Sequence, residues 1–124
     1  GEDYSIIPMR DFDHNEGLSV IDMVIIIRHI RFIELIENPY LLIAADVNNT
    51  SGITISDVIE IREIVLGNQI AFMSNTSWRF IPVDYVFPDP AFPWFPPFPE
   101  QVDLVNQTMD VQVDFYGMKI GDVD

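Results

Sequence analysis

The stretch Asp46-Val47-Asn48-Asn49-Thr50-Ser51-Gly52-Ile53-Thr54-Ile55-Ser56-Asp57 is the most informative part of the sequence, because it has a counterpart 35 residues upstream. That counterpart is Asp11-Phe12-Asp13-His14-Asn15-Glu16-Gly17-Leu18-Ser19-Val20-Ile21-Asp22. In both copies a side chain with an oxygen atom stands at positions 1, 3, 5, 9 and 12, and a glycine stands at position 7. Calcium takes about six to eight oxygen ligands, and a loop of this length supplies them by pointing alternate residues inward. The duplicated pattern therefore predicts two calcium-binding loops.

Each position has a chemical role in such a loop. Position 7 contributes its backbone carbonyl, position 9 acts through a hydroxyl or a water, and position 12 closes the site from the first turn of the following helix. The first loop offers Asp11, Asp13, Asn15, Gly17, Ser19 and Asp22. The second loop offers Asp46, Asn48, Thr50, Gly52, Thr54 and Asp57. We expect two calcium ions, the second bound more weakly because its loop carries only two carboxylates.

A different interpretation of these loops needs no metal. Asp and Asn near glycine also form polar turns, and Asp22 and Asp57 could serve only as helix caps. The duplication favours calcium, because the five carboxylates at ligand positions, Asp11, Asp13, Asp22, Asp46 and Asp57, would repel one another without a cation.

The composition narrows the class of protein. The 124 residues include 6 Lys and Arg against 20 Asp and Glu, which gives a net charge of −14. Such a chain repels a polyphosphate backbone, and we expect no nucleic-acid binding. A hydrophobic content of 48% predicts a packed core. The apolar runs stay well below the roughly 20 residues that cross a bilayer, and we expect no membrane span. The absence of cysteine excludes disulfides and thiol catalysis.

An apolar segment follows each loop and predicts a helix. These segments are Met23–Ile30 and Val58–Leu66, and Gly67 ends the second one. The first segment is apolar on more than one face, because four consecutive residues, 24–27, sweep most of a helical turn. It must be covered either by the C-terminal half of the chain or by a partner, and we expect the C-terminal half to cover it.

The segments outside the loops predict extended structure. The chain begins at Gly1 rather than Met, and Gly1–Pro8 is typical of a short strand, so we expect a processed piece whose residues 1–9 are a linker or the tail of a preceding domain. Short β-prone runs occur at Trp78–Ile81 and Tyr85–Phe87, and the alternation in Met109–Val123 predicts a closing antiparallel strand.

The segment Pro88–Pro99 contains six prolines, which exclude a helix or a central strand. It could be a polyproline ligand or a sugar-stacking strip. We favour a strap that packs Phe92, Trp94 and Phe95 against the helices, because an apolar helix needs cover.

Catalysis has little support in the sequence. His14 and His29 are the only imidazoles, and no two carboxylates are paired by spacing outside the loops. We expect His14 to point outward from its loop and His29 to lie on a helix flank. The chain is therefore predicted not to be an enzyme.

At these residues the chain resembles a protein family. The stretches Asp46-Val47-Asn48-Asn49 and Asp57–Gly67 are similar to dockerin repeats, which are loop-helix units resembling EF-hand loops. Residues 38–46, 75–80, 85–90 and 118–124 resemble, more narrowly, the dockerin-like modules near the C-terminus of large secreted surface proteins of gliding and related bacteria. Two features depart from the pattern, since glycine stands at position 7 instead of 6 and Arg31-Phe32 replaces Leu-Gly after the first helix.

The resemblance implies an α+β fold. A dockerin-like pair of calcium loop-helix repeats would occupy residues 10–73, and a Pro- and aromatic-rich, β-containing C-terminal extension would occupy residues 74–124 and pack on it. It also implies a secreted or cell-surface location within a larger protein. The implied partner is a cohesin-like or neighbouring β-sandwich domain, contacted through loop positions 10 and 11, which are Val20, Ile21, Ile55 and Ser56.

Two functions remain open at this point. The module could dock onto a receptor domain, or it could be a calcium-stiffened structural joint of a large adhesin or filament without a separate receptor. An exposed apolar face on the first helix would favour docking, and a helix buried by its own tail would favour the joint. Ile21 and Ile55 could instead be hydrophobic staples at the helix starts.

Overall fold

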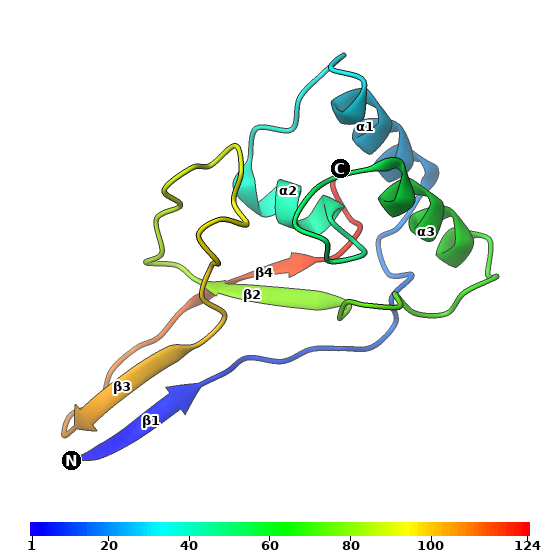
Figure 1. Cartoon of the computed structure of the whole chain (residues 1–124). Coiled ribbons are helices and arrows are strands. Elements are labelled where there is room, and N and C mark those ends of the chain that lie inside the picture. The colour runs from blue at the N-terminus through cyan, green and yellow to red at the C-terminus, as the bar shows by residue number, and fades with distance from the viewer.

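The computed structural model describes all residues from 1 to 124 and has an α+β fold, as the sequence predicted. Three helices and four strands follow one another in the order β1, α1, α2, α3, β2, β3, β4 (Figure 1). The helices are α1 (Val20–Ile30), α2 (Pro39–Ala45) and α3 (Ile55–Val65). The strands are β1 (Glu2–Ile6), β2 (Trp78–Pro82), β3 (Val102–Gln107) and β4 (Phe115–Lys119). No helix combines the length and the apolar character needed to span a lipid bilayer.

The predicted helices α1 and α3 begin in the same way. Ser19 and Thr54 are their N-cap residues, and each donates its backbone N–H to a carboxylate three residues later, Asp22 or Asp57, at 2.8 Å. Position 12 of each loop therefore lies in the first turn of a helix, as the spacing predicted. The two helices pack against each other (Figure 1).

Helix α2 was not predicted from the sequence. The side-chain oxygen of Asn38 caps it by accepting the Tyr40 N–H at 2.9 Å, and Pro39 occupies its first turn, where a missing N–H costs nothing. Residues 42–45 are all buried. Because the helix is apolar on all sides, it lacks the periodic pattern by which a surface helix is recognised.

The core joins five segments of the chain. Its centre consists of isoleucines with no solvent exposure, one each from α1, α2, α3, β2 and the C-terminal tail: Ile26, Ile43, Ile61, Ile81 and Ile120. The antiparallel sheet β2–β4 lies against α2. The second antiparallel sheet, β1–β3, stands away from this body (Figure 1).

Several sequence-based expectations for the C-terminal half differ from the structure. Tyr85–Phe87 is not a strand, and the closing strand covers only Phe115–Lys119. The strap packs inward only in part: Trp94 is half-buried and Phe98 packs on the core, but Phe95 is 72% exposed and Phe92 is also exposed. The C-terminal half covers α1 only in part: Val123 and Met118 share the core with Ile26, but part of the helix faces solvent.

The C-terminal tail is fixed by backbone hydrogen bonds to distant segments. Ile120 donates its N–H to the Ser77 carbonyl at 2.9 Å, and Gly121 donates its N–H to the Ala44 carbonyl at 2.8 Å. Gly121 has a φ of 90°, and a Cβ added there would lie 3.0 Å from a methyl of Leu18. Both the conformation and the contact therefore require glycine.

We predict that Gly121→Ala destabilises the protein more than Gly67→Ala. Both glycines have positive φ, so each substitution costs about 1–2 kcal/mol of backbone strain. Only Gly121 has a close neighbour, and the added contact with Leu18 increases its cost. Urea unfolding of the two variants measures the difference. Equal losses in the free energy of unfolding would contradict the close contact between Gly121 and Leu18.

Candidate metal centre

The second loop brings two buried carboxylates together. Asp46 and Asp57 are 1% and 0% exposed. Asp46 accepts the N–H groups of Thr50 at 3.0 Å and Ser51 at 2.9 Å. Asp57 accepts the N–H groups of Asn48 at 3.1 Å and of its own N-cap. Backbone donors thus orient both carboxylates without neutralising them.

The side-chain amide of Asn48 lies between these carboxylates. The amide atom that faces them lies 2.8 Å from Asp57 Oδ1, 3.1 Å from Asp46 Oδ1 and 2.9 Å from the Thr50 hydroxyl oxygen. An amide oxygen at this place would face only other oxygens, whereas the amide nitrogen at the same place would donate hydrogen bonds to them. Neighbouring ligands of a calcium ion at about 2.4 Å are about 3 Å apart, which matches this spacing.

Two chemical arrangements satisfy these oxygens. A cation among them would bind all of them at once. Alternatively, a half-turn of the Asn48 amide would let its nitrogen donate to both carboxylates and to Thr50. No ion pair in the chain includes Asp46 or Asp57. The nearby Arg79 is already paired with Glu100.

The other predicted residues of the second loop, Gly52 and Thr54, do not take part in this group of oxygens. Thr54 caps α3, and a Cβ added at Gly52 would meet nothing within 4 Å. Position 6 of the loop, Ser51, has a φ of 65°, and position 4, Asn49, has a φ of 57°. The turn that glycine usually provides at position 6 is thus made by Ser51, although serine adopts this conformation less easily.

The first loop does not gather its carboxylates in the same way. Asp11 Oδ1 accepts hydrogen bonds from His14 Nε2 at 2.7 Å and from the Ser77 N–H at 2.9 Å. His14 Nδ1 accepts the Phe72 N–H at 2.8 Å, so Nε2 carries the proton. His14 is buried, and the expectation that it points outward is wrong. Asp11 therefore connects the loop to the segment before β2.

Asp22 meets carboxylates from the C-terminal tail instead. Asp22, Asp122 and Asp124 place one carboxylate oxygen each within 4.8 Å of one another, and Asp11 and Asp13 do not join such a group. Asp22 Oδ1 accepts the Val123 N–H at 2.8 Å. A Cβ added at position 17 would lie 2.5 Å from Asp122 Oδ2, so glycine at this position lets the tail approach.

Other residues of the first loop have local roles. Gly17 has a φ of 76° and Asp13 a φ of 39°, so the turns fall at positions 7 and 3 and not at positions 4 and 6. Ser19 caps α1, and the Asn15 carbonyl accepts the Leu18 N–H at 3.1 Å. The sequence reasoning missed Asp122 and Asp124, for which the only local signal is an acidic run beside Gly121.

Burial controls the electrostatics of these carboxylates. It raises the pKa of Asp57 to about 6, with the charges of Asp46 and Glu60 adding to the effect. Burial, with Asp124 and Asp22 nearby, likewise raises the pKa of Asp122 to about 6. The pKa values of Asp22 and Asp46 are raised for the same main reason. Ionised, these groups destabilise the metal-free fold.

The predicted partner-contact residues are exposed at the starts of α1 and α3. Val20, Ile21 and Ile55 are 60%, 58% and 55% exposed, and Ser56 is exposed as well. The residues in the staple positions before the caps are Leu18 and Ile53, which pack on the core. Ile21 and Ile55 are therefore not staples.

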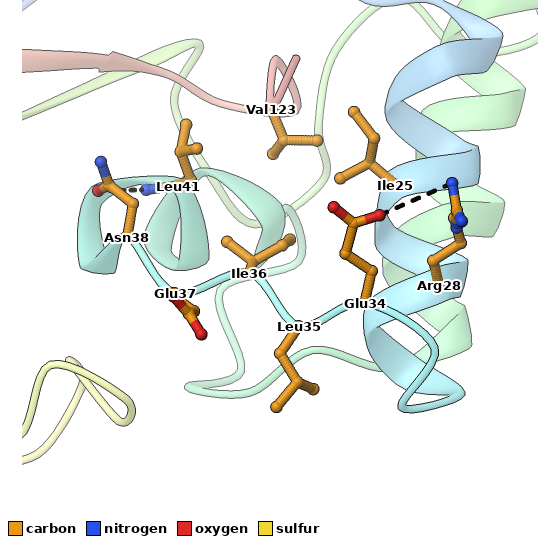
Figure 2. A pocket seen from close by; sticks show the side chains of 9 residues that line it. All are labelled: Ile25, Arg28, Glu34, Leu35, Ile36, Glu37, Asn38, Leu41 and Val123. Carbon is orange, nitrogen blue, oxygen red and sulfur yellow. Dashed lines mark hydrogen bonds and ion pairs between the residues drawn. The ribbon is translucent and has the colours of Figure 1, made fainter.

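A hollow of about 360 Å³ opens between the end of α1 and the start of α2. Ile25 of α1, Leu41 of α2 and Val123 of the tail border it (Figure 2). At its edge Arg28 lies 3.7 Å from Glu34. Five of its nine lining residues are apolar, and Arg28, Glu34, Glu37 and Asn38 supply polar groups, a mixture typical of a ligand-binding pocket.

Comparison with known proteins identifies no relative. Neither the family models, nor the curated proteins, nor the solved structures contain a match to this chain. The interpretation of the site therefore depends on its own geometry.

We predict that the metal-free protein loses stability as the pH rises from about 4 to about 7. The folded state raises the pKa of Asp57 from 3.8 to about 6. Protonated Asp57 therefore adds to the free energy of unfolding below pH 3.8, and this stabilisation is lost as the pH rises through about 6. This shift corresponds to up to about 3 kcal/mol. Asp57→Asn should reduce the dependence of the free energy of unfolding on pH, whereas Asp84→Asn, at an exposed position, should leave it unchanged. Urea unfolding in chelator at several pH values measures it, and identical slopes would contradict the prediction.

Proposed function

We propose that this protein is a calcium-dependent docking module, dockerin-like in its loops, that acts by binding another protein and not by catalysis. The observation that carries the proposal is that two buried carboxylates, Asp46 and Asp57, converge on the side-chain amide of Asn48 with no basic side chain paired to them. Buried carboxylates are costly unless they are paired or bind a metal. A calcium ion among these oxygens would supply the missing charge.

The type and placement of these oxygens favour calcium over magnesium. Carboxylate, amide and hydroxyl oxygens from a flexible loop suit calcium, whereas magnesium requires a rigid octahedron and retains waters. Asp46 is the C-cap of α2, and Asp57 lies in the first turn of α3. An ion here would connect the two helices and fix the start of α3. We place the proposed ion in the second loop, and a second ion in the first loop stays a prediction.

The docking surface in this proposal is the exposed apolar face at the helix starts. Val20 and Ile55 occupy equivalent positions of the repeat, as do Val24 and Ile59 one turn later, and all four are exposed. Exposed apolar residues at matched positions are typical of an interaction surface. They favour docking over a purely structural joint. The proposed partner is a cohesin-like or neighbouring β-sandwich domain of a secreted or cell-surface protein.

We predict that calcium raises the melting temperature by about 10 °C at a hundredfold excess over its dissociation constant, because it binds only the folded state. Asp57→Asn should abolish most of this rise, since it removes a charged ligand. The matched control Asp84→Asn removes an exposed carboxylate and should retain the full response.

Calorimetry with calcium and with magnesium completes this test. One or two calcium ions per chain, with magnesium bound far more weakly, would support the proposal and give the number of sites. An unchanged melting curve in calcium, or an Asp57→Asn variant with the full calcium response, would contradict the ion in the second loop.

We also predict that the proposed docking face contributes little to folding. Ile55→Ser should change the free energy of unfolding by at most about 1 kcal/mol, because Ile55 is exposed. Ile61→Ala on the same helix should cost about 2–5 kcal/mol, because Ile61 is fully buried. Urea unfolding in calcium measures both. A loss at Ile55 as large as that at Ile61 would mean that the face is covered in the folded chain.

A further inference from the structure

The sheet formed by β1 and β3 is separated from the rest of the fold. Its antiparallel register pairs Tyr4 with Leu104 and Ile6 with Val102. Neither strand has substantial contact with any other helix or strand. Figure 1 shows the two strands extending away from the body. A two-stranded sheet alone is marginally stable in water, so this one lacks the support that sheets usually have.

Both outer edges of this sheet are open. Apart from the bonds within the ladder, no backbone–backbone hydrogen bond of the chain involves residues 1–9 or 99–113. Open edges present unpaired N–H and C=O groups to a further strand. Near Asp3 the register is irregular and the Asn106 N–H donates to Asp3 Oδ1, so the regular part of the ladder is Tyr4–Ile6 with Val102–Leu104. Apolar side chains remain exposed beside these edges, including Val105 at 75% and also Tyr4 and Ile7. The edges therefore offer both the hydrogen bonds and the apolar surface of a strand-binding site.

The sheet carries negative charge, which favours a basic partner strand. Residues 1–9 and 101–114 contain no Lys or Arg, and their acidic residues are Glu2, Asp3, Asp103, Asp110 and Asp114. A second copy of this chain would bring the same acidic strands, on a molecule of net charge −14, against this surface. Repulsion between like charges opposes that pairing, whereas a strand with Lys or Arg complements the surface.

We propose that the β1–β3 sheet binds an extended strand rich in Lys or Arg from another protein, by addition to an open edge. Main-chain hydrogen bonds would provide affinity, and the acidic residues would provide selectivity. This surface differs from the helix starts and needs no cation, so the inference goes beyond the docking function proposed above.

The test uses a peptide of about ten residues in which lysine alternates with valine and threonine. We expect binding in calcium and in chelator alike, and weaker binding when NaCl rises from about 50 to about 500 mM, because the attraction is partly electrostatic. Hydrogen exchange should slow in residues 2–6 and 102–107 on binding. The same peptide with glutamate in place of lysine should bind at least about tenfold more weakly.

Two variants at one exposed position test the edge itself. Val105→Lys adds a charge that repels the basic peptide and should weaken binding by about tenfold or more. Val105→Thr keeps a residue suited to a strand and should remain within about threefold of the parent protein. Both variants should melt at the parent temperature, because this sheet barely contacts the core.

Three results would overturn the proposal. The first is an absence of peptide binding at concentrations up to about 1 mM. The second is binding that slows hydrogen exchange in the helices but not in the β1–β3 sheet. The third is a dimer of this chain at low salt whose interface protects the sheet, which would identify a second copy as the occupant.

Discussion

The burial of negative charge is the constraint on which the rest of the structure depends. Asp22, Asp46 and Asp57 have almost no exposure, in a chain whose net charge is −14. Each is held by backbone N–H donors. Asp22 fixes the C-terminal tail through Val123, and Asp57 fixes its loop through Asn48. Since hydrogen bonds orient a carboxylate without removing its charge, burial raises the pKa values of Asp22, Asp46 and Asp57 in the folded chain.

The two loops share a sequence pattern but have different surroundings. In the second loop the carboxylates of Asp46 and Asp57 meet at the side-chain amide of Asn48. In the first, Asp11 is hydrogen-bonded to His14 and Ser77, and the tail brings Asp122 close to Gly17 and Asp22. The tail thereby breaks the symmetry of the duplication. A pattern of ligand types is therefore not sufficient for a site, because the surrounding chain competes for the same carboxylates.

The exposed surfaces divide the molecule into two ends. At one end the starts of α1 and α3 present apolar residues next to the loops, so an ion that fixes the start of α3 would also fix that face. At the other end the β1–β3 sheet is acidic, open at its edges and nearly independent of the core. Binding at one end therefore need not alter the other. This separation suits a module that joins two proteins, since each contact can form by itself.

The sequence by itself determined the elements that depend on residues a few positions apart. The helices after each loop, the position of Asp22 and Asp57 in their first turns, and the strand near Trp78 follow from local periodicity and capping. Asn38 and Pro39 are typical of a helix start, so α2 had a local signal. It was missed because its uniformly apolar sequence has no helical periodicity.

Only the tertiary structure decided which of these residues meet. The carboxylates of Asp22 and Asp122 are 100 positions apart in the chain, and β1 pairs with the equally distant β3. His14 meets Phe72, which lies 58 positions away. Such contacts depend on how the core packs and on where the tail meets α2. A short stretch of sequence does not determine either of these. For the same reason the buried position of His14 and the exposed position of Phe95 could not be deduced in advance.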